Sequence, residues 1–260
     1  MIPHVALVRP HVANPPVVAL HGFTQTSRSW AHLAAHTERP VLAPDLPGHG
    51  DCGAERPANL VEAAALVGAR VGASGSVVSA DAPAVWIGYS LGGRILLHLA
   101  LAHPETVAGI ILVSTTAGID DEAERHARRV SDNALADHVE RVGVEVFLDE
   151  WLAQPLFAQL TVSMAERVDR CRNTSSGLAH SLRSCGTGTQ TPLWSRLGEI
   201  TVPTLVVTGT DDAKFTALGH RLAAGIPSAI HHQLSGVGHS CAAEQPARFA
   251  QLVAEFMATF

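Results

Sequence analysis

The sequence predicts an α/β fold with a mostly parallel central sheet, helices on both faces and an inserted helical cap. Short apolar runs recur along the 260 residues, and each is followed by turn residues and then by a helical pattern. The runs are apolar throughout and do not alternate, which indicates strands covered on both faces, as in a parallel sheet. The rhythm stops between residues 119 and 191, where amphipathic helical segments follow one another without a strand.

The predicted strands follow in chain order from the apolar runs. They are "PVVAL" at 16–20, "RPVLAPD" at 39–45, "AVWIGYS" at 84–90, "VAGIILVS" at 107–114 and "VPTLVVTGTDD" at 202–212. A strand-like run around His231 and a final helix beginning near Gln245 complete the pattern. We therefore assign residues 1–118 and 192–260 to the α/β core and residues 119–191 to the cap.

Composition excludes several classes of protein. Hydrophobic residues make up 47% of the chain and charged residues 16%, which is typical of a globular protein. The net charge of −6 argues against binding to nucleic acid, which requires a basic face. The N-terminus lacks the basic and apolar regions of a secretion signal, and no apolar run approaches the roughly 20 residues that span a bilayer. We expect a soluble, cytoplasmic protein that binds neither nucleic acid nor membrane.

The sequence also carries no sign of a cofactor. The four cysteines show neither C-x-x-C spacing nor a metal-like cluster. They are Cys52, Cys171, Cys185 and Cys241. No G-x-G-x-x-G or Walker pattern occurs. We expect no metal and no nucleotide cofactor, and the sequence does not indicate an oligomeric state.

The stretch "GYSLGGR" at 88–94 predicts a reactive serine. It fits G-x-S-x-G, with a predicted strand before it and a predicted helix after it. Glycines at 88 and 92 allow a tight strand-to-helix turn that leaves Ser90 exposed at the start of the helix. The sequence therefore predicts a nucleophile elbow.

A serine hydroxyl needs a base, and the base needs a carboxylate to orient it. His239 lies after the last predicted strand, and Asp211 and Asp212 end the strand before it. The order serine, aspartate, histidine is the order that this kind of scaffold uses. Placement at the strand end favours Asp212, and Asp211 remains the alternative.

Two backbone N–H groups are needed to stabilise a developing negative charge. The Leu91 N–H directly follows the predicted nucleophile. The second donor should come from the loop after the first strand, where Phe23 follows His21 and Gly22. We expect Phe23 and Leu91 to form the oxyanion hole.

Arg94 is unusual in the first turn of the helix after an elbow. Side chains four residues apart share a helix face and lean toward the N-terminus, so Arg94 should reach back toward Ser90. A cation beside a helix N-terminus is unfavourable without an anion. Spacing alone leaves open whether a carboxylate of the protein or of the substrate supplies that anion.

Several stretches resemble one known family. "LHGFTQTSRSW", "DLPGHG" and "GYSLGGR" resemble α/β-hydrolases in general. Four further stretches are more specific, and the resemblance extends over nearly the whole chain from about residue 16. They are "ARRVSDNALA", "DEWLAQPLFAQL", "SLRSCGTGTQTPLW" and "VTGTDDAKF". Together they resemble the 2-succinyl-6-hydroxy-2,4-cyclohexadiene-1-carboxylate synthases of menaquinone biosynthesis.

The resemblance implies an α/β-hydrolase fold and an elimination. Such an enzyme removes pyruvate from 2-succinyl-5-enolpyruvyl-6-hydroxy-3-cyclohexene-1-carboxylate, with the Ser-His-Asp triad as general base. The substrate, a small tricarboxylate, would give arginines a purpose, because a guanidinium binds a carboxylate through two parallel bonds. By motif, the resemblance assigns Ser90, Asp212 and His239 to catalysis. It assigns substrate binding to Arg94, Arg128, Arg172, Tyr89 and Trp151.

Two other functions remain open from the sequence. The first is a carboxylesterase, thioesterase or carbon–carbon bond hydrolase that acts through an acyl group on Ser90, with a triad that is also compatible with cofactor-free haloperoxidase side activity. The second is a ligand receptor without activity, against which the intact triad argues. Arginines that lie far from Ser90, or that each pair with a protein carboxylate, would favour the hydrolase.

Overall fold

The structure is a computed structural model that describes residues 15–37, 39–73 and 78–260. Its described residues form a six-stranded sheet in the order β2-β1-β3-β4-β5-β6, in which every neighbouring pair is parallel. The strands are β1 Val17–Leu20, β2 Val41–Leu42, β3 Ala84–Tyr89, β4 Val107–Val113, β5 Thr204–Gly209 and β6 Ala229–Leu234. The prediction of a mostly parallel sheet is confirmed.

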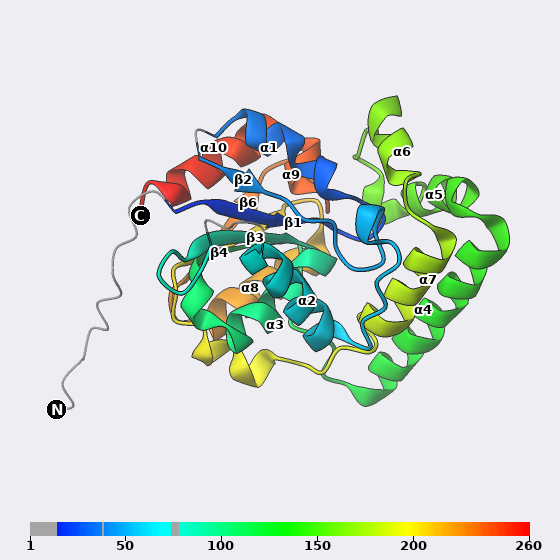
Figure 1. The fold of residues 1–260 in the computed structure, drawn as a ribbon, viewed down its shortest axis with the longest axis horizontal. Helices are drawn as coiled ribbons and strands as arrows, with labels where there is room; N and C mark the ends of the chain where they lie inside the picture. The colour runs from blue at the N-terminus through cyan, green and yellow to red at the C-terminus, as the bar shows by residue number, and fades with distance from the viewer. Residues whose placement is uncertain (1–14, 38, 74–77) are drawn as a thin grey trace.

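Helices cover both faces of this sheet (Figure 1). The core helices are α1 Ala31–Ala35, α2 Leu60–Ala73, α3 Leu91–Ala102, α8 Ala213–Gly225, α9 Cys241–Glu244 and α10 Pro246–Met257. Short 3₁₀ turns are η1 Ser27–Trp30, η2 Gly50–Cys52, η3 Pro104–Thr106 and η5 Trp194–Glu199. None of the helices in the described ranges is long and apolar enough to cross a membrane.

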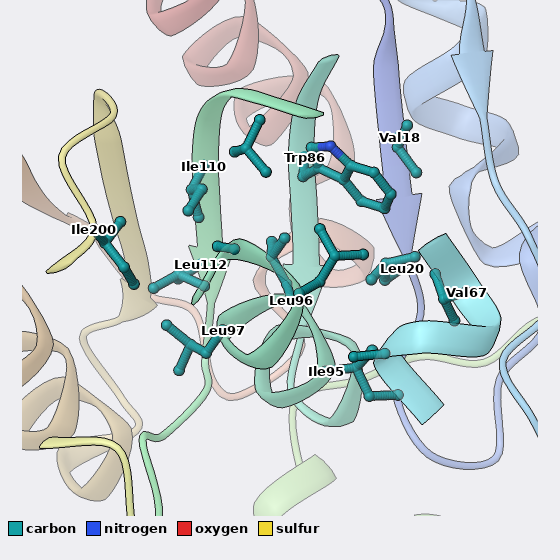
Figure 2. Close-up of a cluster of buried hydrophobic side chains, with 14 of the residues drawn as sticks. Val18, Leu20, Val67, Trp86, Ile95, Leu96, Leu97, Ile110, Leu112 and Ile200 are labelled. Carbon is teal, nitrogen blue, oxygen red and sulfur yellow. The ribbon is translucent and has the colours of Figure 1, made fainter. Parts of the chain in front are cut away.

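Successive residues of each central strand enter different hydrophobic clusters. Val18, Leu20 and Trp86 pack with α2 and α3, as Figure 2 shows. Their neighbours Ala19 and Ile87 pack in a second cluster with α1 and α10. Because side chains alternate across a strand, both faces must be apolar when both are covered. This explains why the strand sequences are apolar without alternation.

The cap lies between β4 and β5 in the chain and beside the core in space (Figure 1). It consists of α4 Glu122–Val142, α5 Val144–Leu152, η4 Pro155–Phe157, α6 Met164–Arg170 and α7 Ser175–Cys185. Its own small core joins α4, α5 and α7. The residues of that core are Ala136, Val139, Phe147, Leu178, Ala179 and Leu182. Residues 119–191, which the sequence assigns to the cap, contain these helices and no strand of the described sheet.

The largest difference from the predicted strands is at β2. The run at 39–45 was expected to form a strand, but only Val41–Leu42 pairs, and it pairs with β1 alone. It lies at one edge of the sheet, as β6 does at the other, but β6 pairs over six residues.

Candidate active site

Ser90 occupies a strained turn between β3 and α3. Its φ of 51° lies in the left-handed region, which non-glycine residues seldom adopt. Glycines make the turn possible: a Cβ at Gly88 would lie 2.6 Å from Gly93 Cα, and one at Gly92 would lie 2.3 Å from Leu20 O. The Ser90 N–H donates to Val113 O at 2.9 Å, which ties the turn to β4. The serine thus stands at the carboxyl end of the sheet, as the motif predicts.

Asp212, and not Asp211, lies against His239. Asp212 caps α8 by accepting from the Phe215 N–H at 3.1 Å, and its other oxygen lies 2.8 Å from His239 Nδ1. Asp211 is exposed and bonds to Gln159 and Thr210. Both Asp212 and His239 are buried, which strengthens their contact. Ser90 and His239 line the same cavity. In the described part of the structure, Ser90 Oγ and the His239 ring are not hydrogen-bonded to each other.

The two expected oxyanion donors line that cavity as well. Phe23 follows β1 and Leu91 begins α3. Among the described residues, neither the Phe23 N–H nor the Leu91 N–H has a protein acceptor. Two unpaired N–H groups near a serine are suited to stabilising an oxyanion.

The cavity above Ser90 has a volume of about 160 Å³ and lies between the core and the cap. Core residues that follow β1, β3, β4, β5 and β6 form its floor, and residues of all four cap helices form its roof. Its lining includes four cationic side chains and one carboxylate, Asp132. The cations are Arg94, Arg128, Arg170 and Lys214. A protein of net charge −6 therefore gathers positive charge in this cavity.

Arg94 is held by a helix end and not by a carboxylate. The guanidinium is buried, and its Nη1 donates to the carbonyl of Cys185, the last residue of α7, at 2.7 Å. The carboxyl end of a helix carries partial negative charge, which favours a cation. The pKa of Arg94 is lowered to about 10, mainly by burial and also by the nearby Arg128, while Cys185 and Asp132 oppose the shift. Most of the five N–H donors remain available for a ligand.

Arg128 also lines the cavity, but it has a protein partner. Its Nε donates to Asp132 Oδ1 at 2.7 Å, one helical turn along α4. Asp132 is 1% exposed and lies close to the turn after α7, where its other oxygen is 3.5 Å from the Gly188 N–H. Within the described residues, the bond to Asp132 uses only Nε of Arg128, so its terminal nitrogens can bind an anion.

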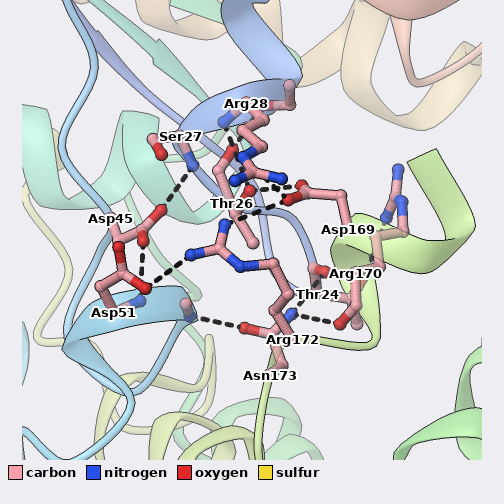
Figure 3. Close-up of polar contacts among 12 residues, drawn as sticks. Thr24, Thr26, Ser27, Arg28, Asp45, Asp51, Asp169, Arg170, Arg172 and Asn173 are labelled. Carbon is pink, nitrogen blue, oxygen red and sulfur yellow. Dashed lines mark hydrogen bonds and ion pairs between the residues drawn. The ribbon is translucent and has the colours of Figure 1, made fainter. Parts of the chain in front are cut away.

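The expectation for Arg172 is not supported by the geometry. Its guanidinium lies outside the lining of the cavity and is bound by Asp51 at 2.5 Å and Asp169 at 3.2 Å (Figure 3). Arg170, two residues earlier, lines the cavity and donates to Thr24 Oγ1 at 2.8 Å. At the carboxyl end of α6 a shift of two residues turns the side chain to a different face, so sequence spacing alone did not separate the two arginines.

Tyr89 and Trp151 line the cavity as expected. The Tyr89 hydroxyl is 2.8 Å from Ser240 Oγ, and burial raises the pKa of this tyrosine. The Trp151 ring stacks on Phe147 and meets Phe23 edge-on at 5.1 Å between centroids. Both side chains therefore pack against neighbouring residues and also form part of the cavity wall.

Several lining residues were not predicted from the sequence. Phe215 lies 4.3 Å from His239 between ring centroids and shields the imidazole, while Phe157 approaches it at 6.1 Å from the cap. Lys214, the only lysine of the chain, stands beside Phe215 in the motif "D-x-K-F". Both residues lie in the stretch "VTGTDDAKF", directly after the aspartate that contacts His239.

Comparison with known proteins agrees with this architecture. Residues 17–252 match the model of the alpha/beta hydrolase family, and the chain belongs to that family. An esterase from Thermogutta terrifontis shares the fold, with a TM-score of 0.77 at 23% identity over 94% of this chain and 90% of its own.

Other relatives narrow the family further. A Bacillus subtilis protein provisionally named 2-succinyl-6-hydroxy-2,4-cyclohexadiene-1-carboxylate synthase is 35% identical, over 94% of this chain and 91% of its own length. The enzyme of that name from Enterobacter sp. is 32% identical over 94% and 92%. The structure of MenH from S. aureus superimposes with a TM-score of 0.87 at 30% identity, covering 95% and 94%. Within the alpha/beta hydrolases, the chain belongs with these synthases.

Proposed function

We propose that this protein is a lyase that removes pyruvate from 2-succinyl-5-enolpyruvyl-6-hydroxy-3-cyclohexene-1-carboxylate. The observation that carries the proposal is the cationic cavity over Ser90. A hydrolase of neutral esters has no use for buried guanidinium groups, whereas a substrate with three carboxylates does. Two arginines in the cavity are not paired with a carboxylate: Arg94 bonds to a helix carbonyl and Arg170 to a threonine hydroxyl.

The triad supplies the base in this proposal. With His239 Nδ1–H donating to Asp212, Nε2 can accept the Ser90 proton. Ser90 Oγ then takes a proton from a ring carbon of the substrate. The electron pair of that C–H bond forms a new ring double bond, the existing ring double bond shifts by one position, and the C–O bond to the enolpyruvyl group breaks. The leaving group takes up a proton and is released as pyruvate.

The surrounding groups stabilise the negative charge that develops as the proton leaves. The Phe23 and Leu91 N–H groups bind the substrate oxygen on which this charge accumulates. Arg94, Arg128, Arg170 and Lys214 hold carboxylates and fix the ring above Ser90. Tyr89, Trp151 and Phe215 exclude water, so that charge pairs are stronger than in bulk solvent.

The test is release of pyruvate from the enolpyruvyl substrate, measured against matched variants. Wild-type protein and Asp211→Asn should turn the substrate over at similar rates. Ser90→Ala and Asp212→Asn should lower kcat by about 10²- to 10⁴-fold, because the serine is lost or the imidazole is held in the wrong tautomer. A wild-type rate no faster than that of Ser90→Ala would exclude the proposal.

An ester assay, compared with the pyruvate assay, distinguishes the hydrolase alternative, which the triad geometry equally permits. A hydrolase forms an acyl group on Ser90 and should give a burst with p-nitrophenyl acetate. Burst kinetics, with ester turnover far above the rate of pyruvate release, would favour the hydrolase over the lyase.

A further inference from the structure

The cap segment from Asp169 to Asn173 is bonded to two loops of the core (Figure 3). Asn173 Nδ2 donates to Thr24 O at 2.8 Å and to Arg170 O at 2.9 Å, and its Oδ1 accepts from the Gly50 N–H at 2.9 Å. Two carbonyl partners on one side and an N–H on the other permit only this orientation of the amide. Asn173 is 5% exposed, so these bonds are formed away from water.

Thr24 needs such a partner because its backbone is strained. Its φ is 67°, in the left-handed region that β-branched residues rarely adopt. A residue in that region stays there only when its surroundings hold it. Thr24 is fully buried, its carbonyl is bound by Asn173, and its hydroxyl is bound by Arg170, so the cap supplies the side-chain bonds to both groups.

The strained residue directly follows a proposed oxyanion donor. Phe23 lies between Gly22 and Thr24, and the Gly22 N–H and the Gln25 N–H are fixed within the same loop, to Gln25 Oε1 and Gly22 O. Because the loop is fixed at Gly22 and at Gln25, the direction of the Phe23 N–H is coupled to the backbone conformation of Thr24 between them. No other side chain in the described part of the structure bonds the Thr24 carbonyl.

We propose that Asn173 is a positioning residue that holds Thr24 in its left-handed conformation and thereby aims the Phe23 N–H at the oxyanion. The oxyanion hole is then complete only when Asn173 is bonded to the Thr24 carbonyl. The inference rests on the proposed function in one respect, the use of the Phe23 N–H during the reaction.

The backbones of the cap and of a core loop are in direct contact next to Asn173. A Cβ at Gly48 would lie 2.7 Å from Gly177 O, and one at Gly177 would lie 2.4 Å from Gly48 O. The loop that contains Gly50 therefore packs directly against the start of α7, one turn beyond Asn173. The cap segment is held in register with both core loops.

Asn173→Asp tests the inference with a minimal change. The carboxylate can still accept from the Gly50 N–H, but it cannot donate to Thr24 O and repels it. Asn133→Asp is the matched control. Asn133 is exposed on α4, and its substitution adds the same negative charge to the cap. The first measurement is hydrogen exchange at the Gly22 and Gln25 amides, which should become at least about tenfold faster in Asn173→Asp alone.

The second measurement is the kcat for pyruvate release. Asn173→Asp should lower kcat by about 10- to 100-fold with a smaller change in KM. The reason is that a misdirected Phe23 N–H no longer forms its hydrogen bond to the oxyanion in the transition state. Adding Thr24→Gly should recover part of this loss, since glycine adopts the left-handed region readily. If Asn173 only stabilised the fold, adding Thr24→Gly would not recover the kcat lost in Asn173→Asp.

Each outcome decides the matter. Unchanged amide exchange in Asn173→Asp would overturn the inference, whatever the activity. Faster exchange with unchanged kcat, or no recovery with Thr24→Gly, would overturn the link to the oxyanion hole. A wild-type protein that releases no pyruvate would refute the proposed function, while the exchange experiment would still decide whether Asn173 holds Thr24. If Asn173→Asp does not fold, Asn173→Ser serves for the same comparisons.

Discussion

At the scale of single residues, the cavity shows how a buried cation is kept without neutralising it. Arg94 uses one of its five donors on the carbonyl end of α7. A helix end offers only a partial charge, so it stabilises the guanidinium less than a carboxylate would and leaves it able to attract an anion. Arg172, by contrast, is bound by two carboxylates and has little left to offer a ligand.

This difference predicts opposite outcomes for two neighbouring arginines. Arg170→Gln should lower kcat/KM by about 10- to 100-fold, which corresponds to the loss of one charged hydrogen bond to substrate. Arg172→Gln removes only contacts with Asp51 and Asp169 and should change kcat/KM by less than about threefold. Steady-state kinetics of pyruvate release would measure both. A large effect at Arg172 together with none at Arg170 would restore the assignment made from the sequence.

Two buried histidines behind the oxyanion loop make stability depend on pH. Burial lowers the pKa of His21 to about 4 and that of His49 to about 3, and the two rings lie 5.2 Å apart between centroids. Both are neutral in the folded protein, while the unfolded chain takes up protons near pH 6.5. Their contribution to stability is therefore fully present above about pH 6.5 and is lost as pH falls toward the folded pKa values.

When the pH falls from 7.5 to 5, we expect each of these histidines to lower the free energy of unfolding by on the order of 2 kcal/mol. His49→Gln keeps a donor for Pro47 O but cannot be protonated, so the variant should lose less stability on acidification. Denaturant unfolding at the two pH values measures the difference, with the exposed His126→Gln as control. An identical pH dependence in His49→Gln and wild type would show that this residue does not titrate on unfolding.

At the scale of secondary structure, two glycines in helices should respond oppositely to alanine. At Gly92 in α3 a Cβ would lie 2.3 Å from Leu20 O and 2.6 Å from His21 O, so the elbow helix could no longer approach β1. At Gly68 in α2 the nearest atom would be Leu99 Cδ1 at 3.7 Å, an ordinary contact. Gly68→Ala should therefore stabilise the protein by about 0.5–1 kcal/mol, through higher helix propensity.

Gly92→Ala should instead destabilise the protein by about 1–3 kcal/mol and abolish pyruvate release, because it displaces Ser90 and the Leu91 N–H together. Thermal unfolding and kinetics of the two variants would be compared directly. Equal melting temperatures for the two would mean that the close approach of α3 to β1 is not required.

The elements differ in how well the sequence predicted them. Long apolar runs such as 84–90 and 107–114 gave β3 and β4, because burial on both faces leaves a strong pattern. The elbow was found because glycine spacing is tied to one backbone geometry. Arg170 and Asn173 were harder to assign, because their partners Thr24 and Gly50 lie more than a hundred residues away. Contacts of that kind leave no local periodicity, so the coupling between cap and oxyanion loop emerges only in three dimensions.

At the scale of the whole molecule, the charge distribution opposes the total charge. The chain carries a net charge of −6, which by itself repels a substrate with three carboxylates. The cavity nevertheless holds Arg94, Arg128, Arg170 and Lys214 against the single carboxylate of Asp132. Partly buried charges are screened less than surface charges at a distance, so the local field should dominate at the mouth of the cavity.

These two influences predict opposite effects of salt on kcat/KM. If the cavity dominates, raising the ionic strength from about 0.05 to about 0.5 M screens the attraction and lowers kcat/KM for the tricarboxylate several-fold. If the net charge dominates, the same salt screens a repulsion and raises kcat/KM. We expect the decrease, and we expect it to shrink in Arg170→Gln, which removes one of the four cations. An increase with salt would show that substrate capture is governed by the outer surface, and that the cavity cations act only after the substrate has entered.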